Sequence, residues 1–200
     1  MTSETAREIE AYLAGTGDGA RVTLRAIGPA DQDEFVELVH ASAALHHPWM
    51  SMAGTAEAFQ TYLRRFDHTT NQGLLVCRRD TGAIAGSVNI NSIIRGRYQN
   101  GSLGYAAFAP SAGQGFMAEG VGLVLGYAFS QLRLHRLEAQ IQPDNQASIK
   151  LVRRLGFRYE GMSPEVLFID GAWRDHERWA ITNTMYSQTP WPPHPSLPPR

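Results

Sequence analysis

One strand–loop–helix pattern near the middle of the chain constrains the fold more than any other feature. An apolar strand pattern over residues 103–108 leads into a loop of small residues over 111–115, and an apolar, helix-compatible run follows over 116–130. The first N–H groups of a helix have no intrahelical partner, and the helix dipole is positive at that end. Gly113 and Gly115 allow the backbone to approach a ligand without a Cβ in the way. We therefore expect this segment to form a cradle for a pyrophosphate.

Two other phosphate-binding motifs and a plain strand-to-helix turn compete with this interpretation. The chain has no Gly-Lys-Ser or Gly-Lys-Thr, which excludes a Walker-type P-loop. A dinucleotide fingerprint would place a third glycine at Ala118, where alanine is tolerated. That fingerprint belongs in a βαβ unit near the start of a domain, with an acidic residue on the next strand. Here many residues precede the loop, and the next strand pattern offers Glu138 only in its middle.

Composition indicates a single soluble domain. The chain has 200 residues, of which 43% are hydrophobic, and this is enough for one substantial core. Its 18 basic and 19 acidic residues nearly cancel, so we expect no general attraction to nucleic acid or to an anionic membrane. No secretory signal and no membrane-spanning run of ~20 apolar residues are visible. The single Cys77 lies in an apolar strand pattern, and we expect a packed thiol in a cytoplasmic protein.

The order of predicted elements divides the chain into three parts. We expect a lead-in over residues 1–19 with a short polar helix over 3–14, a folded domain over 20–186, and a disordered proline-rich tail over 187–200. Within the domain the hydrophobic periodicity and turn residues predict an ordered series of elements. These are a strand at 21–26, a helix from 29, a helix capped by Thr55, a meander of strands at 73–78, 83–93 and 103–108, the cradle and its helix, a strand at 136–141, a helix at 143–155, and strands at 157–159, 166–169 and 173–184.

The adjacent histidines His46 and His47 invite comparison with a metal site. Neighbouring side chains diverge, and no Cys, Asp or Glu lies close in sequence, so we expect no metal here. Pro48 breaks helical geometry at the residue before it. We interpret Trp49 as part of a loop wall that either packs or lines a substrate entrance.

Six short motifs, each modest alone, occur in a specific order between residues 20 and 184. Together they resemble the GNAT superfamily of N-acetyltransferases, and the last one resembles its RimJ/RimL-like branch of ribosomal-protein-alanine N-acetyltransferases. The resemblance implies an α+β fold, in which a mostly antiparallel sheet of about seven strands splays in a V and about four helices flank it. The motifs are Leu103-Gly104-Tyr105, Gly113-Gln114-Gly115-Phe116-Met117-Ala118-Glu119, Leu134-His135-Arg136-Leu137-Glu138, Pro143-Asp144-Asn145-Gln146-Ala147-Ser148, Leu155-Gly156-Phe157-x-x-Glu160-Gly161 and Ile169-Asp170-Gly171-x-Trp173-Arg174-Asp175-His176.

The same resemblance implies acetyl-CoA as cosubstrate and assigns residues to it. The backbone of Ala107 and Phe108 would bond the pantetheine as an added strand would. The side-chain amide of Asn145 would reach the pantetheine, a role compatible with an N-cap, and Ser148 would be a neighbouring contact or a helix-turn hydroxyl. The pyrophosphate would be held by the N–H groups of Gly113, Gln114, Gly115, Phe116, Met117 and Ala118.

The chain departs from the family pattern where the acid and base usually stand. Val152 occupies the place of a common tyrosine acid, and Ser102 that of a common glutamate base. Ala112 likewise replaces an arginine or glutamine that would contact phosphate. A base acting through water remains open at four residues, each of which also has a structural interpretation. These are Ser102, Asn91, Asp175 and His176.

A site without a strong base favours a weakly basic acceptor. A lysine amine has a pKa of about 10.4, whereas an α-amine at about 7.7–8 is partly neutral already. The leaving thiol has a pKa of about 8.5 and leaves readily as thiolate. We expect direct transfer of acetyl to the N-terminal α-amine of a protein in a ternary complex, with Trp49 and Tyr98 near the acceptor. The alternatives are a small amine as acceptor (an amino acid, polyamine or antibiotic), a catalytically weak CoA-binding sensor, and a dinucleotide-binding oxidoreductase. Monomer and homodimer both remain open.

Overall fold

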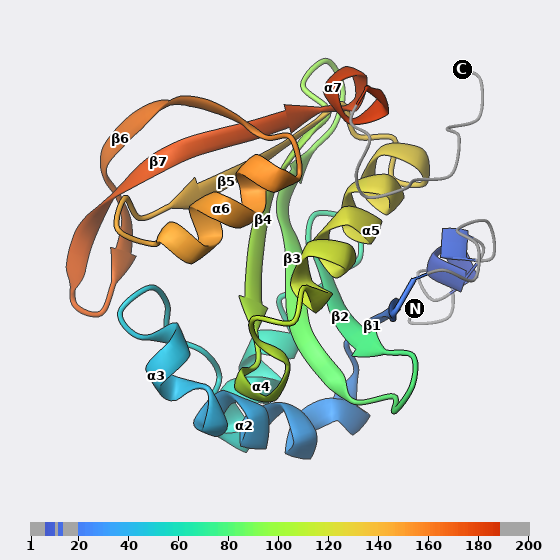
Figure 1. Cartoon of the computed structure of the whole chain (residues 1–200), viewed down its shortest axis with the longest axis vertical. Helices are drawn as coiled ribbons and strands as arrows, with labels where there is room; N and C mark the ends of the chain where they lie inside the picture. Colours follow the sequence, from blue (N-terminus) through green and yellow to red (C-terminus); the bar gives the residue numbers. More distant parts are fainter. Residues whose placement is uncertain (1–6, 11, 14–19, 189–200) are drawn as a thin grey trace.

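The structure, a computed structural model, describes residues 7–10, 12–13 and 20–188 (Figure 1). Residues 7–10 and 12–13 are helical, which agrees with part of the helix expected over 3–14. The remainder of that expected helix, most of the lead-in and the proline-rich tail from residue 189 onward lie outside the described residues.

A seven-stranded sheet in the order β1-β2-β3-β4-β5-β7-β6 forms the centre of the molecule. Every neighbouring pair is antiparallel except β4 and β5, which run parallel. This is the mostly antiparallel sheet expected from the sequence. The strands are β1 (Val22–Ala26), β2 (Gln72–Arg78), β3 (Ile84–Ile94), β4 (Asn100–Ala107), β5 (Arg136–Ile141), β6 (Arg158–Ile169) and β7 (Ala172–Thr182).

The parallel pair opens into a V. Residues 100–103 of β4 pair with residues 136–139 of β5, and the pairing stops there. Strand β4 continues to Ala107 and β5 to Ile141 without further ladder bonds between them. Figure 1 shows the two strands diverging from the upper end of the sheet. The expected splay is therefore present, and it leaves main-chain groups of β4 without a neighbouring strand.

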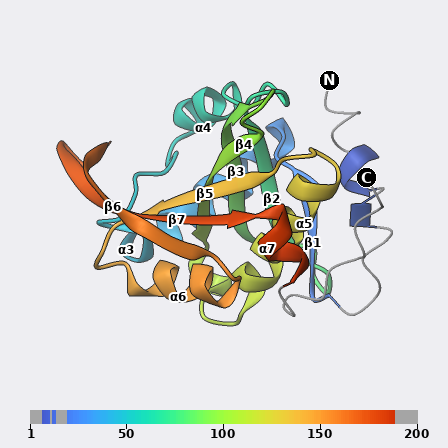
Figure 2. The ribbon, with the colours of Figure 1, turned by 90° about the horizontal axis from the view of Figure 1, so that it is seen from above.

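Helices cover both faces of the sheet, as the view from above shows (Figure 2). The larger hydrophobic core lies under α5 and α6, and a second core lies under α2 and α4. Helices α2 and α6 each present an apolar stripe to the sheet, whereas α5 is buried along almost its whole length. The helices are α2 (Gln32–Ala41), α3 (Ala43–His46), α4 (Ala56–Leu63), α5 (Phe116–Ser130), α6 (Gln146–Arg154) and α7 (Asn183–Ser187), with 3₁₀ turns at Pro29–Asp31 and Ala109–Ser111.

Helix α5 is fixed tightly against the sheet. All of its residues except Glu119 are buried. A Cβ built at Gly120 would lie 2.5 Å from a methyl carbon of Val76, so the glycine is required for this close approach. The loop before α5 is consequently anchored to a rigid element.

The boundaries that differ from the expectations include three in the sheet. Strand β4 begins at Asn100, inside what was expected to be a polar connection. Strand β6 is continuous from residue 158 to 169, because its irregular register on both sides of Ser163 accommodates Pro164 at the edge of the sheet. Strand β7 ends at Thr182, whose hydroxyl accepts a hydrogen bond from the N–H of Met185 and caps α7.

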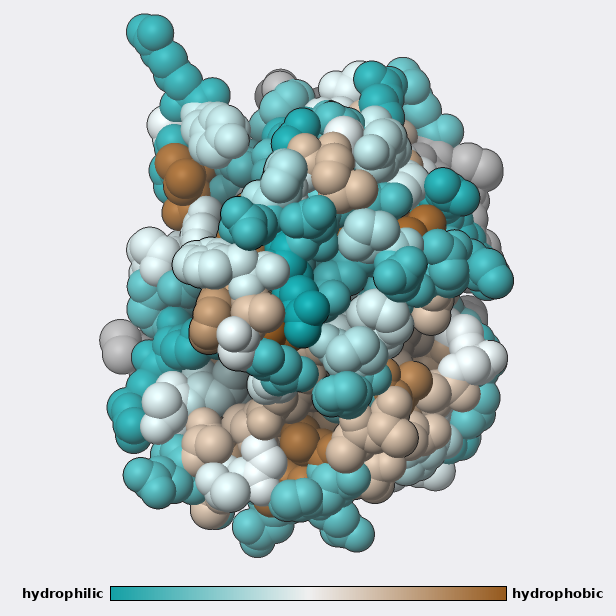
Figure 3. Space-filling view, turned by 90° about the vertical axis from the view of Figure 1, so that its left-hand side faces the viewer, coloured by the Kyte–Doolittle hydropathy of each residue, from teal (hydrophilic) through white to brown (hydrophobic). Residues whose placement is uncertain are grey.

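The surface is largely hydrophilic on the side shown in Figure 3, with apolar side chains gathered toward its lower part. Among the described residues, no helix is both long enough and apolar enough to cross a bilayer. Cys77 is buried, in agreement with a packed thiol, and its burial raises the pKa of that thiol.

Candidate active site

A cavity of about 260 Å³ opens where β4 and β5 part. Residues 103–107 of β4 form one wall and residues 139–141 of β5 form another. The first turn of α6 and Met117 of α5 border it on one side, and the loop that contains Trp49 borders it on the other. The V in the sheet therefore encloses a site that touches the expected cradle.

The cradle has the backbone geometry that its glycines predicted. Gly113 and Gly115 have φ angles of 74° and 85°, in the left-handed region that side chains disfavour. Within the described part of the chain, no acceptor contacts the N–H groups of residues 113–117. The N–H of Ala118 differs from the expectation, because it donates to the carbonyl of Gly115 at 3.0 Å. The N–H groups that can hold an anion thus come from residues 113–117.

Arg21 ties the cradle to the start of β1. Its Nε donates to Glu119 Oε1 at 2.6 Å, its main-chain N–H donates to Oε2 at 3.0 Å, and its Nη2 donates to the carbonyl of Gln114 at 3.1 Å. Glu119 therefore has a structural role, because its carboxylate binds Arg21. The guanidinium groups of Arg21 and Arg78 lie 4.8 and 5.2 Å from the ring centre of Phe116, and they add positive charge beside the helix N-terminus.

Of the two β4 residues expected to bond pantetheine, Ala107 is the one that faces the cavity. The N–H of Phe108 donates to Ala85 and its carbonyl accepts from Ser111, both at 2.9 Å. Both main-chain groups of Phe108 are therefore in use, which differs from the expectation. The N–H and C=O groups of successive residues in a strand point to opposite edges, so those of Ala107 point away from β3. The carbonyl of Ala107 accepts a hydrogen bond from Nε2 of His46 at 2.8 Å.

A pair of hydroxyls lies in the cavity beneath the first turn of α6. Asn145 caps this helix by accepting the N–H of Ser148 at 3.1 Å, and its side-chain amide nitrogen remains available to a ligand. The hydroxyl of Ser148 is hydrogen-bonded to that of Tyr105 on β4. Burial raises the pKa of Tyr105 to about 12, so the phenol stays protonated and can donate. Val152, at the place where a tyrosine acid was expected, is fully buried and has no hydroxyl. Tyr105 brings a hydroxyl to the cavity instead.

His176 presents a free imidazole lone pair. The side chain is 2% exposed and lines the cavity. Its Nδ1 lies 3.0 Å from the carbonyl of Arg174, and because a carbonyl can only accept, this nitrogen carries the hydrogen. Nε2 is then left as an acceptor with no partner among the described residues. Of the four candidate bases from the sequence, His176 is the one that borders this cavity.

The other three candidates lie elsewhere. Asp175 accepts the N–H of Glu165 at 2.8 Å and holds the β6–β7 hairpin. Ser102 and Asn91 face each other across β3 and β4, and neither lines this cavity. Trp49 does line it, whereas Tyr98 is 53% exposed and outside the lining.

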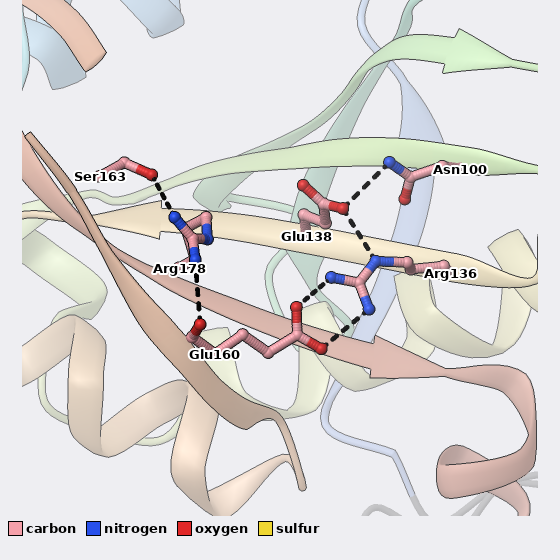
Figure 4. A network of polar contacts seen from close by, with 6 residues as sticks. All are labelled: Asn100, Arg136, Glu138, Glu160, Ser163 and Arg178. Atoms are coloured by element: carbon pink, nitrogen blue, oxygen red, sulfur yellow. Dashed lines mark hydrogen bonds and ion pairs between the residues drawn. The ribbon is translucent and has the colours of Figure 1, made fainter. Parts of the chain in front are cut away.

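Glu138, the residue weighed as a ribose ligand, is occupied by a structural network (Figure 4). It accepts from Arg136 Nε at 2.8 Å and from the Asn100 amide at 3.3 Å. Arg136 also binds the carboxylate of Glu160, whose main-chain carbonyl accepts from Arg178 at 3.0 Å. The network joins β4, β5, β6 and β7, so Glu138 has a structural role. The dinucleotide-binding fold needs a mostly parallel sheet, and the sheet here is mostly antiparallel.

A second cavity of about 160 Å³ lies beside the first. The two share Met50, Gly104, Tyr105 and Ala106 in their linings. The second is completed by side chains of α2, α4 and β3 and by the loop before α4. Residues 104–106 of β4 therefore separate a cavity next to the cradle from a cavity next to α4.

The histidines His46 and His47 do not form a metal site with other residues that the structure describes. His46 is held by Ala107, and Nε2 of His47 lies 4.0 Å from a carboxylate oxygen of Asp170.

Comparisons with known proteins place this geometry in a family. The family model described as acetyltransferase (GNAT) domain matches residues 21–158. The probable N-acetyltransferase YjcK of Bacillus subtilis is 32% identical over 135 residues, which cover 68% of this chain and 75% of that protein. The [ribosomal protein uS5]-alanine N-acetyltransferase of Escherichia coli is 36% identical over 103 residues, which cover 52% of this chain and 53% of that protein. The chain thus matches about half the length of the latter relative.

Solved structures agree with this match. Mycobacterium smegmatis RimJ in complex with CoA-disulfide superposes with a TM-score of 0.76 at 25% identity, covering 84% of this chain and 85% of that one. Ribosomal-protein-S5-alanine acetyltransferase from Vibrio fischeri gives 0.74 at 26% identity, covering 85% and 97%. Spermidine N-acetyltransferase from Vibrio cholerae, in complex with CoA and spermine, shares the fold at 20% identity with a TM-score of 0.71, covering 83% and 98%.

Proposed function

This chain belongs to the GNAT acetyltransferase family, and we propose that it transfers the acetyl group of acetyl-CoA to the α-amine at a protein N-terminus. It is an acetyl-CoA-dependent N-acetyltransferase, and the identity of the acceptor is the proposal. The observation that carries it is the pair of cavities on either side of residues 104–106, one against the cradle and one against α4. The E. coli and V. fischeri relatives are named as alanine acetyltransferases of a ribosomal protein, which supports a protein N-terminus as acceptor.

Acetyl-CoA fits the first cavity by its chemistry. The N–H groups of residues 113–117 supply donors for the diphosphate, and Arg21 and Arg78 lie nearby. Pantetheine amides would bond the edge of β4 at Ala107 and the side-chain amide of Asn145. The thioester would then lie near Tyr105, because this residue borders both cavities.

The reaction needs one base and one hydrogen-bond donor. The neutral amine attacks the thioester carbonyl, a C–N bond forms, and the C–S bond breaks. Nε2 of His176 accepts the proton from the amine, directly or through a water molecule. The hydroxyl pair of Tyr105 and Ser148 donates to the departing sulfur, and the phenol is protonated because burial raises its pKa to about 12. An α-amine, with a pKa of about 7.7–8, needs only this modest base.

The two cavities also bear on the alternative acceptors. None of the described residues that line them is an aspartate or a glutamate. A polyamine keeps further positive charges after one amine has lost its proton, and these charges require carboxylates nearby. The described lining therefore favours an acceptor without extra cationic groups.

The test is incubation of the protein with acetyl-CoA and a peptide library, followed by mass spectrometry of the products and measurement of released thiol. A matched library blocked at the α-amine but carrying free lysines serves as control. We expect acetylation at α-amines, with thiol released in equal amount. Products only on lysine or only on polyamines would contradict the proposal, and acetyl-CoA binding without thiol release would indicate a sensor instead.

A further inference from the structure

The second cavity carries a single charged side chain. Its described lining is apolar or neutral except for Arg65, which stands two residues after the end of α4. This cavity is on the far side of residues 104–106 from the cradle, where an acceptor must approach the thioester. Any preference of this cavity for acceptors of one charge over another would therefore arise from Arg65.

The guanidinium of Arg65 is exposed and has no carboxylate partner among the residues that the structure describes. Its Cζ lies 5.9 Å from the ring centre of Tyr62, and the Tyr62 hydroxyl donates to Asn89 Oδ1 at 2.8 Å. The ring below the guanidinium is thus fixed, while the charge itself remains free. By contrast, Arg21 and Arg136 are both bound to glutamates.

One acid, Asp170, contacts the loop wall of this cavity from outside the lining. Asp170, in the β6–β7 turn, accepts a hydrogen bond from the hydroxyl of Ser51 at 2.6 Å and lies 4.0 Å from Nε2 of His47. Ser51 lines the cavity, so Asp170 stands behind its wall. Asp170 is not part of the described lining, so the charged side chain that lines the cavity is Arg65.

The cavity has room for only a small part of an acceptor. Its volume of about 160 Å³ is well below the ~300–1,000 Å³ of pockets that enclose drug-sized ligands. A chain entering it would place only its first residue or two inside. A group that meets Arg65 must consequently lie close to the reacting amine.

We infer that Arg65 selects acceptors that carry a carboxylate within about one residue of the reacting amine. An N-terminal segment with Asp or Glu at its second position has this chemistry, and so does the α-carboxylate of a free amino acid. The inference rests on the proposed function in assigning the second cavity to the acceptor. An arginine–carboxylate pair at a partly exposed site should raise kcat/KM about three- to tenfold, and added salt should reduce that preference.

The experiment compares two peptides that differ only in Asp or Asn at the second position after an N-terminal alanine. Wild-type protein should acetylate the Asp peptide about three- to tenfold more efficiently, and Arg65→Gln should abolish this preference. Arg65→Glu should favour a peptide with Lys at the same position. Arg64→Gln is the matched control, because Arg64 is also exposed but donates to Thr61 at 2.9 Å and lies outside the lining.

The outcomes separate this inference from the proposed function. Wild-type protein that acetylates the two peptides at equal rates would overturn the role of Arg65. So would an Arg64→Gln variant that loses the preference to the same extent as Arg65→Gln. Neither result would contradict the proposed acetylation of peptides. If peptides are not acetylated but small amines are, the proposed function fails, and alanine and alaninamide become the test pair. A preference for alanine that Arg65→Gln removes would then support the inference, and no preference would refute it.

Discussion

The hydroxyl of Tyr105 should affect the rate of acetyl transfer far more than it affects stability. In Tyr105→Phe the ring remains in place, and the hydroxyl of Ser148 loses its partner. Removing one hydrogen bond lowers the free energy of unfolding by about 0.5–1.5 kcal/mol. Removing a donor to the leaving sulfur lowers kcat by about 10²–10³-fold. The protein should therefore stay folded while its turnover falls.

The raised pKa of Tyr105 gives the prediction a pH dependence. Burial raises this pKa from 10.0 to about 12, so the phenol should remain a donor across an assay from pH 7 to 10. Because the folded-state pKa lies above the ordinary value, the stability that the neutral phenol contributes is fully present below pH 10. It should be lost as the pH rises from 10 to about 12, and Tyr105→Phe should lack this loss.

The assay is release of CoA thiol at saturating acetyl-CoA and peptide, with thermal unfolding measured on the same samples. Tyr159→Phe is the control, because Tyr159 is 48% exposed and lies outside both cavities. Ser148→Ala should have a similar effect on kcat, and the double variant with Tyr105→Phe should be little slower than either single one, since the two hydroxyls act as a unit. A kcat for Tyr105→Phe within twofold of wild type would refute the reasoning.

Three further results are expected. His176→Gln should lower kcat about 10²–10⁴-fold in the thiol-release assay, and a change confined to KM would exclude His176 as the base. Arg21→Gln frees the carbonyl of Gln114 and should raise KM for acetyl-CoA about fivefold, so an unchanged KM would show that the cradle holds without it. Gly120→Val should lower the free energy of unfolding by about 1–3 kcal/mol, because its side chain would collide with Val76, and an unchanged melting temperature would contradict that packing.

Local signals in the sequence were sufficient for the cradle and for most elements. The helix over 116–130 and the strand over 136–141 occur at those bounds. Gly113 and Gly115 have the positive φ angles that a close backbone approach requires. These features depend on residues that are neighbours in the chain, and hydrophobic periodicity with turn chemistry therefore predicts them.

The contacts that distinguish one site residue from its neighbours depend on register and on distant pairing. Strand alternation, set by the pairing of β3 with β4, decides that Ala107 rather than Phe108 faces the cavity. The Tyr105–Ser148 hydroxyl pair joins positions 43 residues apart, and Arg21 meets Glu119 across 98. No local pattern brings such residues together, so the hydroxyl pair and the Arg21 anchor could not be predicted.

The diphosphate site at residues 113–117 is tested most directly by isothermal titration calorimetry with CoA and with pantetheine, which lacks the diphosphate and nucleotide. Several charge-assisted hydrogen bonds from main-chain N–H groups should make CoA bind at least about 100-fold more tightly than pantetheine. Equal affinity for the two ligands, or no binding of CoA, would contradict the assignment of the cradle and of the reaction built on it.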